Sequence, residues 1–362
     1  MTDRGYKPLG MTDIEVPWVG ESRSSDILCP MDLVSLTRRL VDIESISGNE
    51  RAVGEFLLAH LSSLGYAATR MEVTPERFNV YAPVLGRKPD VVFSTHMDTV
   101  PPFIPSSEDS EHIYGRGSCD AKGIIAAQIA AAERLRQESV VIPALLFVVG
   151  EERDSQGATV ANQHAPGSRF LINGEPTENH IAIASKGSLR VELVARGRMA
   201  HSAYPELGES AIDKLLDTLH RLRLMELPTC PEIGPSTLNI GIIEGGEAPN
   251  VVPPFAKAQL LYRLVGPSDD LKRRIIETVG DRAEVTFVLE IPFVRLRTVD
   301  SIPTMVAAFT TDVPRLSNWG EPVLLGPGSI HVAHTERERV EKRQLHEAVE
   351  LYWKVAKKLM SG

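Results

Sequence analysis

Apolar residues recur at helical or strand spacing along most of the chain after residue 31. An apolar residue every three or four positions predicts two helices within residues 31–64, separated by a polar break at 45–49. An Ala-rich segment at 124–136 predicts a further helix. Apolar runs predict strands at 79–84, 91–95, 144–149 and 170–172. Apolar strands that alternate with helices are typical of an α/β fold, a mostly parallel sheet with helices on both faces.

The pattern changes between residues 187 and 296. There, apolar and polar residues alternate, as in strands with one exposed face. The segments read strand, helix, strand, strand, helix, strand, at 188–195, 211–222, 236–243, 256–265, 271–279 and 284–289. This order predicts a ferredoxin-like α+β unit inserted in the larger domain.

The predicted organisation therefore has four parts. Residues 1–30 form an N-terminal extension, and residues 31–186 form the first part of the larger domain. The inserted domain spans 187–296, and residues 297–362 return to the larger domain and end in a helix at 344–359.

Composition and charge narrow the class of protein. The chain has 362 residues, enough for two domains, and a formal net charge of −9. No Lys/Arg stripe indicates a nucleic-acid partner, and no apolar stretch reaches the roughly 20 residues that span a bilayer. Its three cysteines are isolated, which fits a reducing compartment, so we expect a cytoplasmic protein.

Acidic residues and one histidine follow three of the predicted strands. His96 and Asp98 lie two apart at the end of the first, so their side chains project to the same face. Glu151 and Glu152 follow the second, and Glu175 follows the third. Because the carboxyl ends of parallel strands meet at one edge of a sheet, we expect these five side chains to lie close together.

A cluster with several neighbouring carboxylates indicates that a cation binds among them. Neighbouring carboxylates raise one another's pKa unless a divalent metal compensates them, and Asp120, in the loop before the Ala-rich helix, adds another. Histidine with carboxylates suits zinc, manganese or cobalt. Adjacent side chains diverge near a strand end, so one of Glu151 and Glu152 can bind metal while the other takes a proton from water. The Gly-rich loop 115–123 lacks the spacing of a phosphate-binding loop.

A Gly/Pro turn near the C-terminus leads to two histidines, His331 and His334. Either could be a further ligand, and their separation of three does not choose between them.

Five motifs, in order along roughly residues 31–362, resemble those of the dinuclear zinc deacylases and exopeptidases. This family includes acetylornithine deacetylase, succinyl-diaminopimelate desuccinylase and carboxypeptidase G. The motifs are Ser94-Thr95-His96-Met97-Asp98, Gly115-Arg116-Gly117 with Asp120-Ala121-Lys122-Gly123, Gly150-Glu151-Glu152, Gly174-Glu175-Pro176-Thr177, and Gly197 with Ala200-His201-Ser202-Ala203.

The resemblance implies a centre of two divalent metal ions, zinc or else cobalt or manganese. Asp120 would bridge the two ions. His96 and Glu175 would complete one site, and Glu152 and His334 the other.

The resemblance also implies catalytic roles. Asp98 would orient His96 through a hydrogen bond. Glu151 would be the general base, and the peptide bond after Asp120 is often cis in the family. The inserted domain resembles a lid and dimerisation domain, in which His201 would reach the active site of the partner subunit of a homodimer and stabilise the oxyanion.

Substrate contacts are implied for five residues. Arg263 and Asn250 resemble residues that bind the substrate carboxylate, which the planar fork of Arg suits. Lys186 lies at the hinge into the inserted domain, and Gly328 and Ser329 belong to the final Gly/Pro motif.

That final motif is more similar to those of the acetylornithine deacetylases than to those of the desuccinylases. We therefore expect a hydrolase that removes a small N-acyl group from a basic amino acid, N-acetylornithine deacetylase of arginine biosynthesis being the first choice. The alternatives are succinyl-diaminopimelate desuccinylase, a hydrolase of carrier-protein conjugates of lysine or ornithine, and a dipeptidase or carboxypeptidase. A metal-dependent binding protein without catalysis is an alternative of another class.

Overall fold

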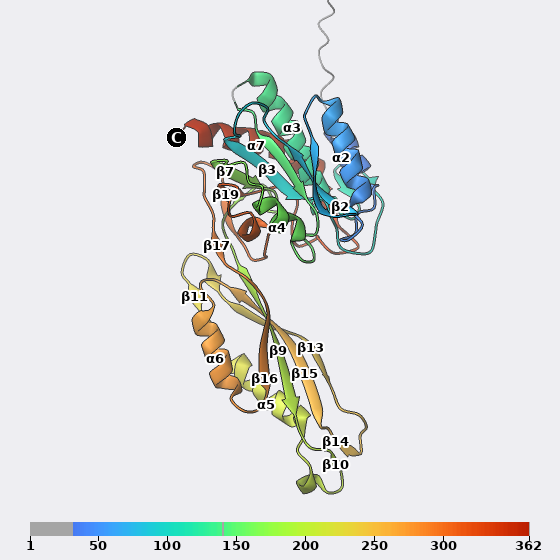
Figure 1. Ribbon diagram of the computed structural model, residues 1–362, viewed down its shortest axis with the longest axis vertical. Helices are drawn as coiled ribbons and strands as arrows, with labels where there is room; N and C mark the ends of the chain where they lie inside the picture. The colour runs from blue at the N-terminus through green and yellow to red at the C-terminus, as the bar shows by residue number, and fades with distance from the viewer. Residues whose placement is uncertain (1–31, 140, 362) are drawn as a thin grey trace, which may run out of the picture. The chain divides into compact units, whose positions relative to one another are not determined.

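A six-stranded sheet forms the centre of the larger domain (Figure 1). The computed structural model describes residues 32–139 and 141–361, so the N-terminal extension expected at 1–30 lies outside the described residues. The strand order is β1 (Thr69–Thr74), β2 (Arg77–Ala82), β6 (Ala144–Val148), β3 (Val91–His96), β7 (Phe170–Asn173) and β19 (Glu321–Leu324). β6, β3, β7 and β19 pair in parallel, whereas β2 pairs antiparallel with both β6 and β1. The mostly parallel sheet is confirmed.

Alternate residues of the central strands pack against helices on opposite faces. Val92 belongs to a core cluster with Trp319 and with α4 (Gln156–Asn162). Phe93, the next residue, points the other way, and its ring lies 5.4 Å from that of Tyr352. Burying each such side chain stabilises the fold by roughly 1.5–3 kcal/mol. The other helices of this domain are α1 (Leu33–Val41), α2 (Arg51–Ser63), α3 (Lys122–Glu138) and α7 (Lys342–Ser361).

The inserted domain is a four-stranded antiparallel sheet with two helices on one face. The order is β13 (Thr237–Gly245), β15 (Phe255–Leu264), β9 (Gly187–Arg196) and β16 (Glu284–Ile291), with α5 (Ala211–Leu224) and α6 (Asp269–Val279) packed against it. Along β9, Leu189, Val191 and Leu193 face this helical core, and the residues between them point to the opposite face. The predicted ferredoxin-like unit is confirmed, element by element.

The two crossings between the domains pair with each other. β8 (Ile181–Ser185) leads directly into β9, β17 (Val294–Arg295) follows β16, and the two pair antiparallel. β18 (Thr304–Ala307) adds a parallel partner to β8. This small sheet holds the near ends of β9 and β16 beside the larger domain.

The remaining elements are short. They are β4 (Ser107–Glu108), β5 (His112–Tyr114), β10 (Ala200–His201), β11 (Thr229–Cys230), β12 (Gly234–Pro235), β14 (Val251–Val252), β20 (Arg339–Glu341), and the 3₁₀ helices η1 (Pro205–Leu207) and η2 (Val313–Arg315). Among the helices within the described ranges, none is both long and apolar enough to cross a membrane.

Candidate metal centre

Three neighbouring strands deliver the acidic residues to one edge of the larger sheet. β3 lies between β6 and β7 and ends at His96. After β6 the chain turns at Gly150, whose φ of +79° is one that residues with a Cβ rarely adopt. A Cβ there would also lie 2.6 Å from the Arg77 guanidinium. The turn brings Glu151 and Glu152 to the same edge as His96.

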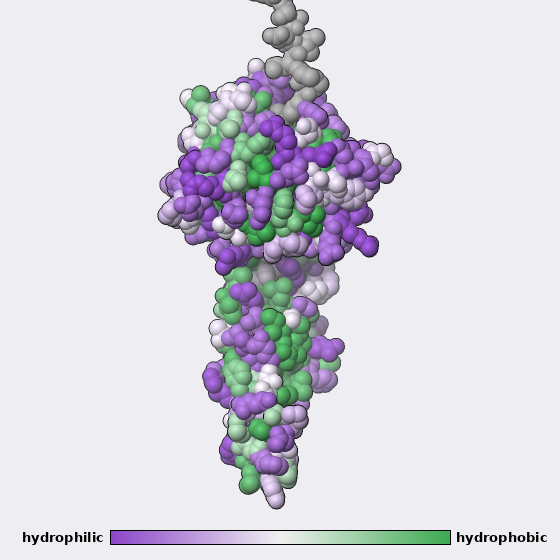
Figure 2. Space-filling view, turned by 90° about the vertical axis from the view of Figure 1, so that its right-hand side faces the viewer, coloured by the Kyte–Doolittle hydropathy of each residue, from purple (hydrophilic) through white to green (hydrophobic). Residues whose placement is uncertain are grey.

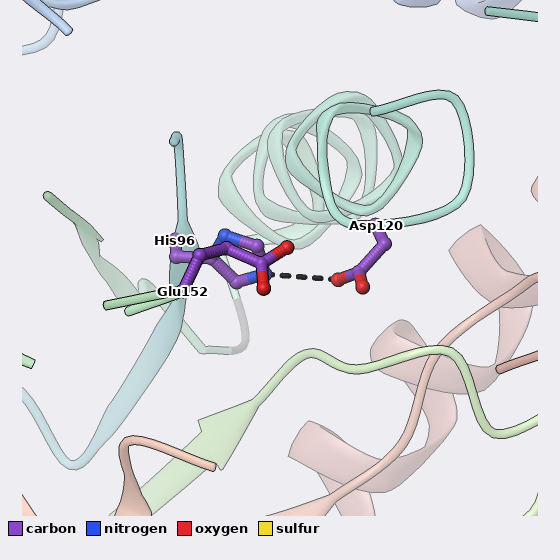
Figure 3. Close-up of side chains that lie close together, drawn as sticks. All are labelled: His96, Asp120 and Glu152. Atoms are coloured by element: carbon purple, nitrogen blue, oxygen red, sulfur yellow. Dashed lines mark hydrogen bonds and ion pairs between the residues drawn. The ribbon is translucent and has the colours of Figure 1, made fainter. Parts of the chain in front are cut away.

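Asp120 stands between two histidines. Its Oδ1 lies 3.0 Å from Nε2 of His96, and its Oδ2 lies 3.2 Å from Nε2 of His334. The same nitrogen of His334 is 2.9 Å from Oε1 of Glu152. Ligand atoms of His96, Asp120 and Glu152 all lie within 4.8 Å of one another (Figure 3). The peptide bond after Asp120 is cis, as the resemblance implies.

These spacings fit metal ligands. Two ligand atoms about 2.0–2.1 Å from one tetrahedral zinc ion lie roughly 3.3 Å apart. The pairs around Asp120 have that separation, and each carboxylate oxygen of Asp120 faces a different histidine. The donor set of imidazole and carboxylate suits zinc, cobalt or manganese.

The charges of the cluster are strongly coupled. Burial opposes protonation of His96, yet its contacts with Asp120 and Asp98 hold its pKa well above the usual value. Contacts with Asp120 and Glu152 raise the pKa of His334 to about 10. Burial raises the pKa of Glu152, and the neighbouring charge of Asp120 raises it further. Proton uptake is thus favoured at the positions where a bound cation would otherwise compensate the carboxylates.

Glu151 and Glu175 lie in the same cavity but outside the tight group. Desolvation raises the pKa of Glu151 well above its usual value, and the charge of Glu175 adds to this effect. Glu175 is 4% exposed, and burial likewise raises its pKa.

Asp98 contacts the chain on both sides of the turn after β6. Its carboxylate accepts the backbone N–H groups of Glu151, at 3.0 Å, and Glu152, at 3.2 Å, and the hydroxyl of Ser47, at 2.6 Å. The nearest contact of Nδ1 of His96 is the main-chain oxygen of Asp98, at 3.0 Å, whereas the carboxylate is 3.6 Å away. The side chain of Asp98 therefore holds Glu151 and Glu152 more closely than it holds the imidazole.

A cavity of about 300 Å³ opens over this cluster. The larger domain and the near end of the inserted sheet both line it, with Asp120, Glu151, Glu152, Arg153, Glu175, Ser188, Leu261, Arg263, Leu289, Ile291, Phe309, Thr310, Ile330 and His334. Burial lowers the pKa of Arg263, and within the described part of the chain no carboxylate compensates it. Its guanidinium is thus available to an anionic ligand.

His201 lies at the other end of the inserted sheet. It pairs with Val251 across β10 and β14, next to Asn250. These strands adjoin the Phe255 end of β15, eight residues from Arg263, which is roughly 26 Å along a strand. His201 is exposed, and neither it nor Asn250 lines the cavity.

Three further predicted residues contact protein groups outside the cavity. Nζ of Lys186 donates to the carbonyl of Pro235 at 2.7 Å. The N–H of Gly328 donates to the side chain of Gln344, and the hydroxyl of Ser329 donates to Glu178.

Sequence reasoning missed Ser47, Glu338 and Asp312. Glu338 accepts the backbone N–H groups of Gly117, at 2.8 Å, and Asp120, at 3.3 Å. Asp312 is 1% exposed, and its negative charge raises the pKa of Glu151 and Glu175. The position of Glu338 four residues after His334 was an available signal, whereas Ser47 and Asp312 carry none in their spacing.

Comparison with known proteins identifies the family. Residues 183–287 match the peptidase dimerisation domain M20_dimer. A peptidase M20 domain-containing protein of Schizosaccharomyces pombe is 41% identical over 341 residues, covering 89% of this chain and 83% of its own length. The chain belongs to the M20 peptidase family. A protein of Aspergillus flavus named probable carboxypeptidase is 38% identical over 397 residues, covering 96% of this chain and 92% of its own length.

Solved structures share the M20 fold. A tripeptidase from Staphylococcus aureus has a TM-score of 0.79 at 21% identity and covers 91% of this chain and 98% of its own. An M20 family metallo-carboxypeptidase from Sulfolobus solfataricus has a TM-score of 0.69 at 17% identity, with coverages of 90% and 99%.

The family membership establishes an M20 metallohydrolase. The relatives are named peptidases and carboxypeptidases, so they favour the exopeptidase alternative over the N-acetylornithine deacetylase that the final motif suggested. Nothing in them supports a role in arginine biosynthesis.

Proposed function

We propose that this M20 metallohydrolase is an exopeptidase of the carboxypeptidase type, which cleaves the amide bond before a carboxyl-terminal residue. The observation that carries this proposal is a single cavity with Asp120 between two histidines on one wall and the uncompensated Arg263 on the other. In this proposal residues 31–186 and 297–362 form the catalytic domain, and residues 187–296 form the dimerisation domain.

Two divalent metal ions fit the donor set. Asp120 would bridge them, with His96 and Glu175 on one ion and Glu152 and His334 on the other. The 3.0 and 3.2 Å contacts of the two Asp120 oxygens support this division. Of the two histidines of the final loop, His334 is the one whose Nε2 contacts Glu152 and Asp120.

Glu151 would move the proton during hydrolysis. When bound, the metal ions polarise the scissile carbonyl and acidify the attacking water. Glu151 lines the cavity beside the cluster, and burial raises its pKa above the usual carboxyl value, which favours uptake of a proton. It would take the proton from the water and return it to the leaving amine, while Asp98 fixes its backbone position.

His201 would act across a homodimer. It lies too far along its own sheet to reach the cavity of the same subunit, so a partner's copy would supply the donor to the oxyanion. Leu216, Ile242 and Ile243 are exposed apolar residues of the inserted domain and support a dimer through that domain. Apolar surface on that domain is visible in Figure 2. Asn250, beside His201, would enter the same partner site.

Arg263 would bind the carboxylate of the substrate. Its planar fork suits two parallel hydrogen bonds to a carboxylate, and it lines the same cavity as Asp120, Glu152 and His334. Lys186, Gly328 and Ser329 remain candidates for substrate contact through movement of the hinge and of the final loop.

A turnover panel on the zinc- or cobalt-loaded protein tests the function. Dipeptides and N-acetyl dipeptides with a free carboxyl terminus should be hydrolysed, and the same compounds with an amidated terminus should not. Faster turnover of N-acetylornithine than of any peptide would favour the deacetylase instead. Two bound metals per chain with no hydrolysis would overturn the enzyme assignment in favour of a binding protein.

A further inference from the structure

The wall of the cavity opposite the metal cluster is largely apolar. β15, β9 and β16 place their residues in register across it. Arg263 and Ile291 both pair with Ser188, and one step along the sheet Leu261 and Leu289 both pair with Arg190. Leu261, Leu289 and Ile291 therefore share one face, on either side of β9.

The larger domain closes this apolar surface from the other side. Phe309 and Ile330 line the cavity from segments that lie before and after β19. Three aliphatic side chains from the inserted sheet thus face an aromatic ring and an isoleucine. The five lie in the same 300 Å³ cavity as the guanidinium of Arg263.

The charges of the lining disfavour a basic substrate side chain. Every acidic lining residue, namely Asp120, Glu151, Glu152 and Glu175, belongs to the metal cluster or lies beside it as the base. The other charged lining residues, apart from His334, are Arg153 and Arg263, both cationic. Arg190, which pairs with both Leu261 and Leu289, is exposed and does not line the cavity. Among the described lining residues, a lysine or ornithine side chain would meet the two arginines and no carboxylate apart from those four.

We propose that the protein selects substrates whose carboxyl-terminal residue has an apolar side chain, seated on Leu261, Leu289 and Ile291 beside the Arg263-bound carboxylate. This inference rests on the proposed exopeptidase function and specifies its substrate class. It reverses the basic amino acid expected from the final Gly/Pro motif. Apolar pockets discriminate by roughly 10- to 200-fold per methylene, so the selectivity is measurable.

The test compares N-acetylglycyl-X substrates with X as leucine, phenylalanine, lysine and aspartate on the metal-loaded enzyme. We expect kcat/KM for leucine and phenylalanine to exceed that for lysine at least tenfold, roughly the lower limit of such discrimination. It should exceed that for aspartate as well, because the aliphatic side chains of Leu261, Leu289 and Ile291 offer no hydrogen-bond donor to a carboxylate. Equal or better hydrolysis of the lysine or aspartate substrate overturns the inference and leaves the exopeptidase function standing. Hydrolysis of none of them overturns the function and the inference together.

A substitution in the apolar wall localises the effect. Leu289→Asp should lower kcat/KM for the leucine substrate at least tenfold and raise it for the lysine substrate. Val288→Asp is the matched control, because Val288 is the next residue on β16, is 47% exposed and does not line the cavity. The control should keep the wild-type ratio of kcat/KM for the leucine substrate to kcat/KM for the lysine substrate. An unchanged ratio in Leu289→Asp, or an equal change in both variants, overturns the proposal.

Binding without turnover gives an independent measurement. On a Glu151→Gln background, calorimetry should show tighter binding of N-acetylglycyl-leucine than of N-acetylglycyl-lysine, and Leu289→Ala should reduce the difference. Equal affinities overturn the proposal even if activity is too low to measure. Leu289→Ala also serves if Leu289→Asp does not fold.

Discussion

The carboxylate of Asp98 fixes the backbone of two adjacent glutamates, Glu151 and Glu152, for which different roles are proposed. Asp98 is fully buried and accepts the N–H groups of both Glu151 and Glu152. Burial opposes its ionisation, but the nearby imidazole of His96 and the hydrogen bonds from Ser47 and Glu151 lower its pKa. The side chains of Glu151 and Glu152 then diverge from a fixed backbone, one toward the cavity and the other toward His334.

Asp98→Asn should damage catalysis through position. The asparagine amide keeps one acceptor oxygen, but its NH₂ group faces a backbone N–H, which is also a donor. One buried polar group is then left without a partner, which costs about 1–3 kcal/mol of stability. We expect kcat to fall at least tenfold with a smaller change in KM, and metal content near that of the wild type. Ser47→Ala is the control, because it removes one donor and leaves both backbone contacts. Full activity of Asp98→Asn would contradict the positioning role.

Glu151→Gln should separate metal binding from turnover. The amide cannot accept the proton, and general bases contribute roughly 10²- to 10⁴-fold to rate. We expect that loss in kcat with an unchanged metal content, measured by steady-state kinetics and elemental analysis. Glu244→Gln, at an exposed position of β13, should behave as the wild type. A Glu151→Gln enzyme with a tenth of the wild-type kcat would exclude Glu151 as the base.

Metal affinity should rise with pH. Without metal, contacts with Asp120 and Glu152 raise the pKa of His334 to about 10, and contacts with Asp120 and Asp98 raise that of His96, so protons compete with a metal ion for both imidazoles. Because metal ligands must be deprotonated, binding releases these protons, and raising the pH toward 10 should tighten it. The same raised pKa values stabilise the metal-free fold below the unfolded histidine value near 6.5, and this contribution is lost as the pH rises through about 10. Calorimetry in buffers of different ionisation enthalpy measures the protons that are released when metal binds. Metal binding without proton release would contradict the assignment of His96 and His334 as ligands.

At the scale of elements, the loop before α3 depends on a buried ion pair. Arg116 and Glu338 are 2% and 1% exposed, and their charged atoms lie 2.6 Å apart. Glu338 also accepts N–H groups from Gly117 and Asp120. The segment that carries His334 and Glu338 therefore supports the loop that carries Asp120.

Glu338→Ala should destabilise the fold far more than the loss of an exposed pair. Removing one partner of a buried pair costs roughly 3–5 kcal/mol, whereas an exposed pair contributes about 0–1 kcal/mol. Glu284→Ala is the matched control, because its partner Arg196 is 66% exposed. Denaturant unfolding measures the free energy of unfolding of both variants. Equal losses would contradict a larger contribution of the buried pair to stability. The milder Glu338→Gln should weaken metal binding while the protein stays folded.

The elements that the sequence predicts well are those with a strong apolar pattern. β6 is a continuous apolar run and β3 begins with one, because helices cover both faces of the sheet, and their predicted bounds agree within a residue. β1 was missed because it is an edge strand whose residues are all exposed or partly exposed, and Met71 and Val73 alone are too short an apolar pattern. β8 and β17 were missed because pairing between segments more than one hundred residues apart leaves no local signal.

The candidate site was predictable where a strand carries it and less so elsewhere. His96, Glu152 and Glu175 follow from strand ends, whereas spacing left His331 and His334 equal until the fold brought His334 to Asp120. The contacts of Asp98 with the backbone of Glu151 and Glu152 join two strand ends, and no single segment encodes them.

At the scale of the whole molecule, the cavity joins residues that are distant in the chain. Its acidic wall comes from strand ends of the larger domain, and its apolar wall comes from the near ends of β15 and β16. The paired crossings β8 and β17 hold those near ends. His201 lies in the separate two-stranded sheet of β10 and β14, beyond the far end of β15. The inserted domain would thus serve two active sites in a dimer.

A mixed dimer tests whether His201 acts across subunits. Glu151→Gln and His201→Ala homodimers should each be nearly inactive, since an oxyanion donor contributes roughly 10²- to 10³-fold. In a dimer of one Glu151→Gln and one His201→Ala subunit, isolated through two different tags, one of the two sites combines an intact Glu151 with the partner's His201. We expect about half of the wild-type activity per dimer. Tyr204→Ala, which removes an exposed neighbour of His201, is the control and should stay active alone. A mixed dimer no more active than its parents, or a fully active monomer, would place His201 outside the mechanism.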